Sequence, residues 1–139
     1  MSKQKLIYPM IVTEYDNEVT VEYNFGGGMT IVTGGDTLYD ALEDAKKMLE
    51  FSLSTLYEQQ KDFPVVTKDQ IKEFVANKDE NQSVNYITTT LEDVIKNYGT
   101  EPVKKTISIP LYMDSLLGAR NISLSKYVQS KIEQDFFAT

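Results

Sequence analysis

The 139-residue sequence contains neither cysteine nor histidine. Without cysteine the chain can form no disulfide, no thiolate metal site and no thiol nucleophile. Without histidine it lacks the usual general base near neutral pH and the commonest metal ligand. Any catalysis would have to use carboxylates, lysines or hydroxyls alone. The sequence therefore predicts a protein that is not an enzyme and that needs no metal or other cofactor.

Long hydrophobic runs are lacking as well. No apolar segment approaches the roughly 20 residues needed to cross a bilayer. Tyr8, Pro9 and the Thr13, Glu14 pair interrupt the apolar core that a signal peptide would need. A hydrophobic content of 41% is nevertheless enough to bury a core. We expect a soluble, cytoplasmic protein made of one small domain and a short appended module, with no membrane partner.

The net charge of −7 is unevenly distributed along the chain. Residues 1–98 hold 17 acidic residues against 9 lysines, which gives −8. Residues 99–139 hold 4 acidic and 5 basic residues, which gives +1. An acidic body repels nucleic acid and attracts basic partners. Only the C-terminal segment is therefore electrostatically suited to approach DNA.

Strand patterns occupy much of the first hundred residues. Alternating apolar and polar residues predict strands over 5–14, 18–25 and 29–33, and a β-branched run predicts a fourth over 84–89. In the first strand we expect one face to point toward the core, and this face consists of Leu6, Tyr8, Met10 and Val12.

Three threonines with capping-box spacing predict where helices begin: Thr37, Thr67 and Thr90. The first helix should run to about Gln60 and end before Pro64. Its expected inward stripe is Leu38, Leu42, Ala45, Leu49, Ser52 and Leu56. Gly99 suits the end of the third helix, and Glu101 with Pro102 suits a joint between domains at 1–100 and 101–139.

The C-terminal segment shows a strand pattern followed by two helix patterns. Over 103–109, Ile107 and Ile109 should face one way and the polar residues the other. Helices are expected over about 111–119 and from Ser123 onward, the second with its apolar residues at helical spacing. About 35 residues are too few to bury their own apolar face. The segment therefore needs a second copy or the first domain to cover it.

This segment resembles the ribbon–helix–helix family of DNA-binding modules. The resemblance implies that two chains pair their strands into an antiparallel ribbon that lies in the major groove, where such a ribbon fits. Lys104, Thr106 and Ser108 would then read base edges, while Ser123 and the free amides of the second helix grip a phosphate and Lys126 adds charge. The alternative is an ordinary edge strand with two packing helices.

The first hundred residues resemble the HicB family, whose domain has a degenerate ribonuclease-H-like fold. The matching stretches are 8–12, the second strand to Phe25 and, most specifically, the Gly-Asp-Thr-Leu-x-x-Ala-Leu-x-x-Ala run over 35–45. The chain departs from the family at Phe25 to Gly28, where the family usually has a proline-containing loop. The resemblance implies an α+β fold with a βββαβ domain followed by the ribbon–helix–helix module.

What the HicB resemblance implies is a toxin partner: the small, basic HicA protein, which cleaves mRNA. The chain would inhibit it with its N-terminal domain and repress its own operon by binding operator DNA as a homodimer, with higher-order assembly left open. We expect the toxin to meet an acidic surface; the alternative is a solvated strand face. The candidate residues are Glu14, Asp16, Glu18 and Glu22.

Other functional classes are weighed against this one. Active ribonucleases H hold two metal ions with carboxylates on central strands, but the first strand has none before Glu14 and 84–89 has none at all, which disfavours a metal nuclease. A stand-alone repressor whose acidic domain senses a ligand or another protein is one rival. An adaptor that binds no DNA is the second rival.

Overall fold

The computed structural model describes residues 4–98 and 103–137. Its elements are β1 (Lys5–Glu14), β2 (Val19–Tyr23), β3 (Ile31–Gly35), α1 (Leu38–Glu58), α2 (Lys68–Asn77), β4 (Gln82–Thr90), α3 (Leu91–Tyr98), α4 (Leu111–Ala119) and α5 (Leu124–Phe137). The fold is α+β, as the sequence predicts. The expected helix end at Gly99 and the joint at Glu101 and Pro102 lie outside the described residues.

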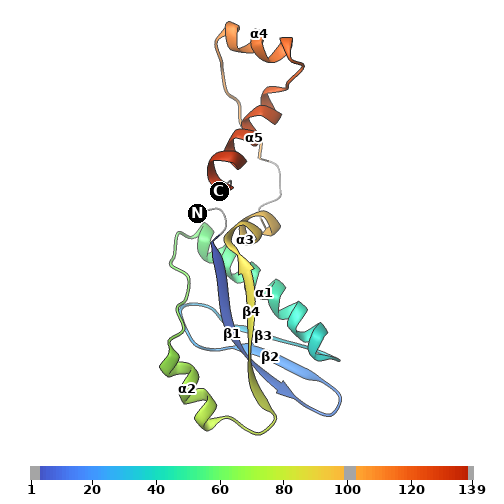
Figure 1. Ribbon diagram of the computed structural model, residues 1–139, viewed down its shortest axis with the longest axis vertical. Coiled ribbons are helices and arrows are strands. Elements are labelled where there is room, and N and C mark those ends of the chain that lie inside the picture. The colour runs from blue at the N-terminus through green and yellow to red at the C-terminus, as the bar shows by residue number, and fades with distance from the viewer. Residues whose placement is uncertain (1–3, 99–102, 138–139) are drawn as a thin grey trace.

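The four strands form one antiparallel sheet in the order β3-β2-β1-β4. Along β1 the predicted inward residues, Leu6, Tyr8, Met10 and Val12, are all buried. The long helix α1 packs across this face against β2, β3 and β4 (Figure 1). Within residues 4–98 the sequence patterns therefore predict all four strands and the buried face of β1. The third strand is displaced, since the sequence predicts it over 29–33 and it is observed over Ile31–Gly35.

The start of α1 is set by its close approach to β3. The Thr37 hydroxyl accepts a hydrogen bond from the Asp40 N–H at 3.1 Å, which confirms the predicted cap. A Cβ on Gly35 would lie 2.8 Å from the Ala41 nitrogen, so the strand leads almost directly into the helix. Because Ala41 lies against the strand, Leu38 points outward and is 37% exposed. The buried stripe is therefore Ala41, Ala45, Leu49, Leu53 and Leu56, and the expected Leu38 and Ser52 are not part of it.

A buried carboxylate ties α1 to the far end of β4. Glu50 is 5% exposed and accepts hydrogen bonds from the Thr89 hydroxyl and, at 3.3 Å, from the Asn97 side-chain amide. The Tyr98 hydroxyl also donates to the Lys47 carbonyl at 2.6 Å. Because a buried polar group is costly without partners, these contacts fix α3 against α1.

The segment before α2 lies beside the half of β1 that β2 leaves unpaired, since β2 pairs only with Ile11–Glu14. The Tyr8 hydroxyl donates to the Pro64 carbonyl at 2.8 Å. Burial, with a smaller effect from Tyr23, raises the pKa of Tyr8 to about 12. The capping box at Thr67 is present, and the Gln70 side chain donates to the Phe25 carbonyl at 3.0 Å. The hydrogen bond from Gln70 therefore anchors the start of α2 to Phe25, the residue before the three glycines at 26–28.

Gly27→Ala is expected to lower the free energy of unfolding by about 2–4 kcal/mol, as measured by urea denaturation. Gly27 has a φ of +78°, and a Cβ there would lie 2.5 Å from the Pro64 Cβ. Gly28 is the matched control because its φ is +79° but its Cβ would meet no atom within 4 Å. Gly28→Ala should cost only the backbone strain, about 1–2 kcal/mol. Equal losses would show that the Pro64 contact relaxes freely.

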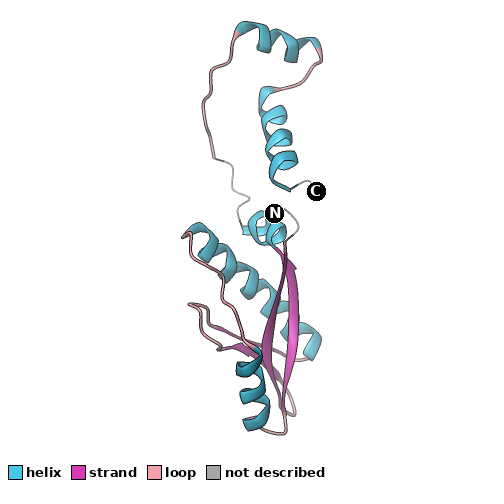
Figure 2. Ribbon diagram, turned by 60° about the vertical axis from the view of Figure 1, so that its left-hand side comes forward, coloured by secondary structure: helices cyan, strands magenta, loops and turns pink. Residues whose placement is uncertain are grey.

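The C-terminal part, residues 103–137, stands apart from the sheet in both views (Figures 1 and 2). Both predicted helices are present, and neither α4 nor α5 has a buried residue. Asn121 ends α4 with a φ of 55°, and the Ile122 N–H bonds to the Leu117 carbonyl at 2.9 Å. Asparagine adopts this left-handed backbone conformation more readily than most residues, so Asn121 suits the end of a helix.

The strand expected over 103–109 is not formed in the single chain. Within the described residues, this segment makes no backbone hydrogen bond to another strand. A strand exists only when its N–H and C=O groups pair with a neighbour, and one copy of the chain offers none here. The sequence pattern can indicate which residues alternate, but not where the pairing partner comes from.

Candidate functional site

Three connections meet at the end of the sheet farthest from α4 and α5 (Figure 1). They are the end of β1 with the β1–β2 turn (14–18), the end of β3 with the first turn of α1 (35–40) and the α2–β4 loop (78–81). The strand register brings them together, since Glu14 pairs with Val19 and Val19 with Gly35. The Glu14 N–H also donates to the Asn81 carbonyl at 2.9 Å, and the Asn81 amide returns a bond to the Glu14 carbonyl at 3.1 Å.

These connections concentrate negative charge, and we call their charged residues the acidic end. The acidic end contains seven exposed carboxylates and one lysine, which gives a net charge of −6. Most of the −8 carried by residues 1–98 therefore lies at one end of the molecule. Like charges held in one region produce a long-range field that attracts cations. The residues are Glu14, Asp16, Glu18, Asp36, Asp40, Asp79, Glu80 and Lys78.

The structure gathers three of the four acidic residues predicted from the sequence. Glu14, Asp16 and Glu18 lie at the acidic end, whereas Glu22 lies near the other end of β2, half-buried between Ile11 and Val32. The other four carboxylates were missed, because they come from connections distant in the sequence. Only the strand order, which places the three turns together, could have revealed them.

Two tyrosines add apolar surface to this end. Tyr15 is 55% exposed in the β1–β2 turn, and Tyr39 is 72% exposed in the first turn of α1. Tyrosine is enriched where proteins bind one another, because it combines a large apolar ring with a polar tip. The acidic end therefore offers both charge and contact area to a partner.

A second candidate surface is an open apolar groove of about 560 Å³ in the C-terminal part. It lies between the segment before α4 and the two helices. Arg120 is the one charged lining residue, and several large apolar side chains there are more than 40% exposed, Leu116 by 63%. The lining is completed by Ile107, Ile109, Tyr112, Met113, Leu117, Ile122, Leu124, Tyr127 and Val128.

The predicted DNA-contacting residues are all exposed and lie outside the lining of this groove. Lys104, Thr106 and Ser108 alternate with the isoleucines that line it. At the start of α5 the Ser123 hydroxyl accepts a hydrogen bond from the Lys126 N–H at 3.2 Å. Within 103–109, Ile107 and Ile109 thus line the groove and the three polar residues do not, although the strand itself is not formed.

Two further properties concern residues 4–98 and 103–137. Within them no group of three or more acidic side chains is arranged to hold a metal ion. Over the same residues, no helix combines the length and the apolar character that a membrane span requires.

These features define a small α+β protein whose exposed elements are an acidic end and an apolar two-helix groove. No protein-family model and no curated protein match the sequence. A toxin–antitoxin complex from Streptococcus pneumoniae shares the fold with a TM-score of 0.53 and 18% identity, covering 95% of this chain and 99% of that one. The antitoxin HicB3 gives 0.50 and 13%, covering 96% and 100%.

A third solved structure, the antitoxin HicB of Burkholderia pseudomallei, gives a TM-score of 0.46 and 17% identity over 91% of this chain and 96% of that chain. The chain has the fold of the antitoxin HicB3, at a TM-score of 0.50, and shares it with the Streptococcus pneumoniae toxin–antitoxin complex, at 0.53. The resemblance stated from the sequence is thereby confirmed at the level of the fold.

Proposed function

We propose that the chain is the cytoplasmic antitoxin of a type II toxin–antitoxin pair. Residues 1–100 bind and inhibit a basic, HicA-type mRNA-cleaving toxin, and residues 101–139 form a ribbon–helix–helix module that dimerises and represses the operon. The observation that carries the proposal is the separation of an acidic end from an uncovered two-helix groove, in a fold shared with solved antitoxins.

Electrostatics supports the toxin-binding role of the acidic end. A protein that binds RNA presents a cationic surface, and a net −6 at one end of the antitoxin can compete with RNA for it. Tyr15 and Tyr39 supply aromatic side chains of the kind that anchor protein interfaces. The proposed toxin-binding site therefore consists of the carboxylates of the acidic end, and Glu22 lies outside it. These carboxylates are Glu14, Asp16, Glu18, Asp36, Asp40, Asp79 and Glu80.

Packing supports the dimer. A groove lined by exposed leucine, isoleucine and tyrosine is unfavourable in water, and a second copy can cover it. Pairing of two 103–109 segments would satisfy their unpaired backbone groups at the same time. Lys104, Thr106 and Ser108 would then project from the ribbon on the side away from the apolar core, where the major groove can be read.

The deciding experiment is a pull-down of the tagged chain co-expressed with its adjacent small open reading frame. We expect a basic partner below roughly 100 residues, toxic alone and silent on co-expression. Failure to recover any such partner, with a dimer that still shifts its own promoter DNA, would contradict the antitoxin proposal and favour the stand-alone repressor.

A further inference from the structure

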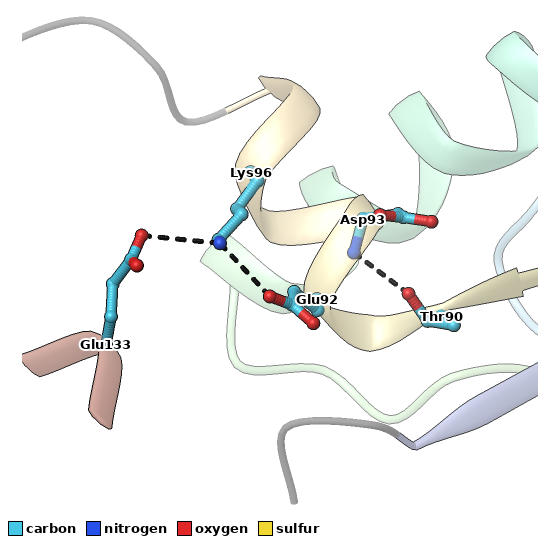
Figure 3. A network of polar contacts seen from close by, with 5 residues as sticks. All are labelled: Thr90, Glu92, Asp93, Lys96 and Glu133. Carbon is cyan, nitrogen blue, oxygen red and sulfur yellow. Dashed lines mark hydrogen bonds and ion pairs between the residues drawn. The ribbon is translucent and has the colours of Figure 1, made fainter. Parts of the chain in front are cut away.

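One lysine joins the C-terminal helix to the helix that follows the sheet (Figure 3). The Lys96 Nζ atom of α3 lies 3.0 Å from Glu92 on its own helix and 3.3 Å from Glu133 on α5. The same nitrogen lies 5.3 Å from the centroid of the Phe137 ring. Glu133 and Phe137 are four residues apart on α5, so Lys96 contacts two successive turns of that helix.

The local geometry favours a charged and oriented Lys96. Glu92 precedes it by four residues, which is the favourable order for an ion pair on a helix, and Lys96 is in the last turn of α3, where the helix dipole favours a cation. Hydrogen bonds with Glu92 and then Glu133 raise the pKa of Lys96. Glu92 thus holds the ammonium group where α5 can reach it.

We propose that Lys96 is a latch that holds the C-terminal part against residues 4–98 in the free chain. Since α4 and α5 bury no residue, no extensive core fixes their position. The side chains of Lys96 and Glu133 are 43% and 62% exposed, so their attraction is weak and is screened by salt. Contacts of this kind make the latch reversible.

A closed latch fixes the direction of the acidic end relative to the C-terminal part. Strand β4 begins beside the acidic end and finishes at Thr90, where α3 begins. The latch therefore lies at one end of the sheet and the acidic end at the other (Figure 1). An open latch would release the C-terminal part from α3 and let the two parts reorient relative to one another. The latch operates whether or not that part binds DNA.

The test measures the distance between two spin labels in the full chain. Because the chain has no cysteine, Ser83→Cys and Ser130→Cys, both at exposed positions, supply the only thiols. Dilution with unlabelled chain restricts the measurement to pairs within one copy. We expect one narrow distance distribution at low salt. A broad distribution in this otherwise unchanged chain would overturn the proposal.

Charge-reversal variants test whether the contact between Lys96 and Glu133 causes the narrow distance distribution. Lys96→Glu and Glu133→Lys should each reduce the ratio of closed to open chains by roughly tenfold and broaden the distribution. The double variant should restore it, because the new lysine faces two glutamates on α3. Lys131→Glu, an exposed position on the same helix, is the control and should change nothing. Single variants that stay narrow, or a double variant that stays broad, would show that Lys96 is not the latch.

Discussion

Replacing Lys104 and Thr106 together by alanine is expected to reduce the affinity of the chain for its own promoter DNA by about 100-fold or more. Both side chains are exposed and neither belongs to the lining of the apolar groove. Each contact to a base edge contributes about 1–3 kcal/mol to discrimination, and a dimer loses every contact twice. Toxin binding should not change, because neither residue belongs to the acidic end.

Fluorescence anisotropy with a labelled promoter fragment measures this loss at one fixed salt concentration, since DNA affinity depends steeply on salt. Lys72→Ala with Thr88→Ala is the matched control: it removes an exposed lysine and an exposed threonine from residues 4–98. The control should bind DNA normally. If the Lys104 and Thr106 variant lost DNA and toxin binding equally, the proposed division of labour would be wrong.

Reversing two charges of the acidic end should slow toxin association. Asp16→Lys with Glu18→Lys is expected to lower the association rate constant by roughly 10–100-fold at low ionic strength, with a smaller effect at high salt. Both side chains are exposed in the β1–β2 turn, so the fold should be retained. Stopped-flow fluorescence with the purified toxin measures the rate.

A second variant distinguishes the effect of where the charge lies from the effect of the total net charge. Glu58→Lys with Asp62→Lys changes the net charge equally but lies at and just beyond the C-terminal end of α1, away from the three acidic connections. This control should slow association far less. Equal slowing in the two variants would mean that the total charge attracts the toxin and that the acidic end has no special role.

Much of the fold follows from local patterns in the sequence. Period-two alternation identifies the buried face of β1 through Tyr8 and Met10, and threonine caps identify the starts of α1 and α2. These signals suffice because one face of a strand or one turn of a helix is decided by neighbouring residues. The HicB resemblance then gives the order of the elements.

The remainder depends on contacts between distant segments. The inward stripe of α1 shifts to Ala41 because Gly35 brings β3 against the helix, and this contact has no signature in the helix itself. Asp36 joins Glu14 at the acidic end only because β3 and β1 flank β2. Glu50 has a polar, ionisable side chain, yet it is buried and hydrogen-bonded to Thr89 and Asn97, which alternation alone cannot indicate.

The C-terminal part buries no side chain by itself, and this has a consequence for gene dosage. If two copies must meet to complete its core, the amount of DNA-binding form rises with the square of the chain concentration while single chains predominate. Repression would then depend more steeply than linearly on the number of copies of the chain per cell. Under the proposed function, a few-fold fall in the level of the chain would release the promoter and restart synthesis of the chain.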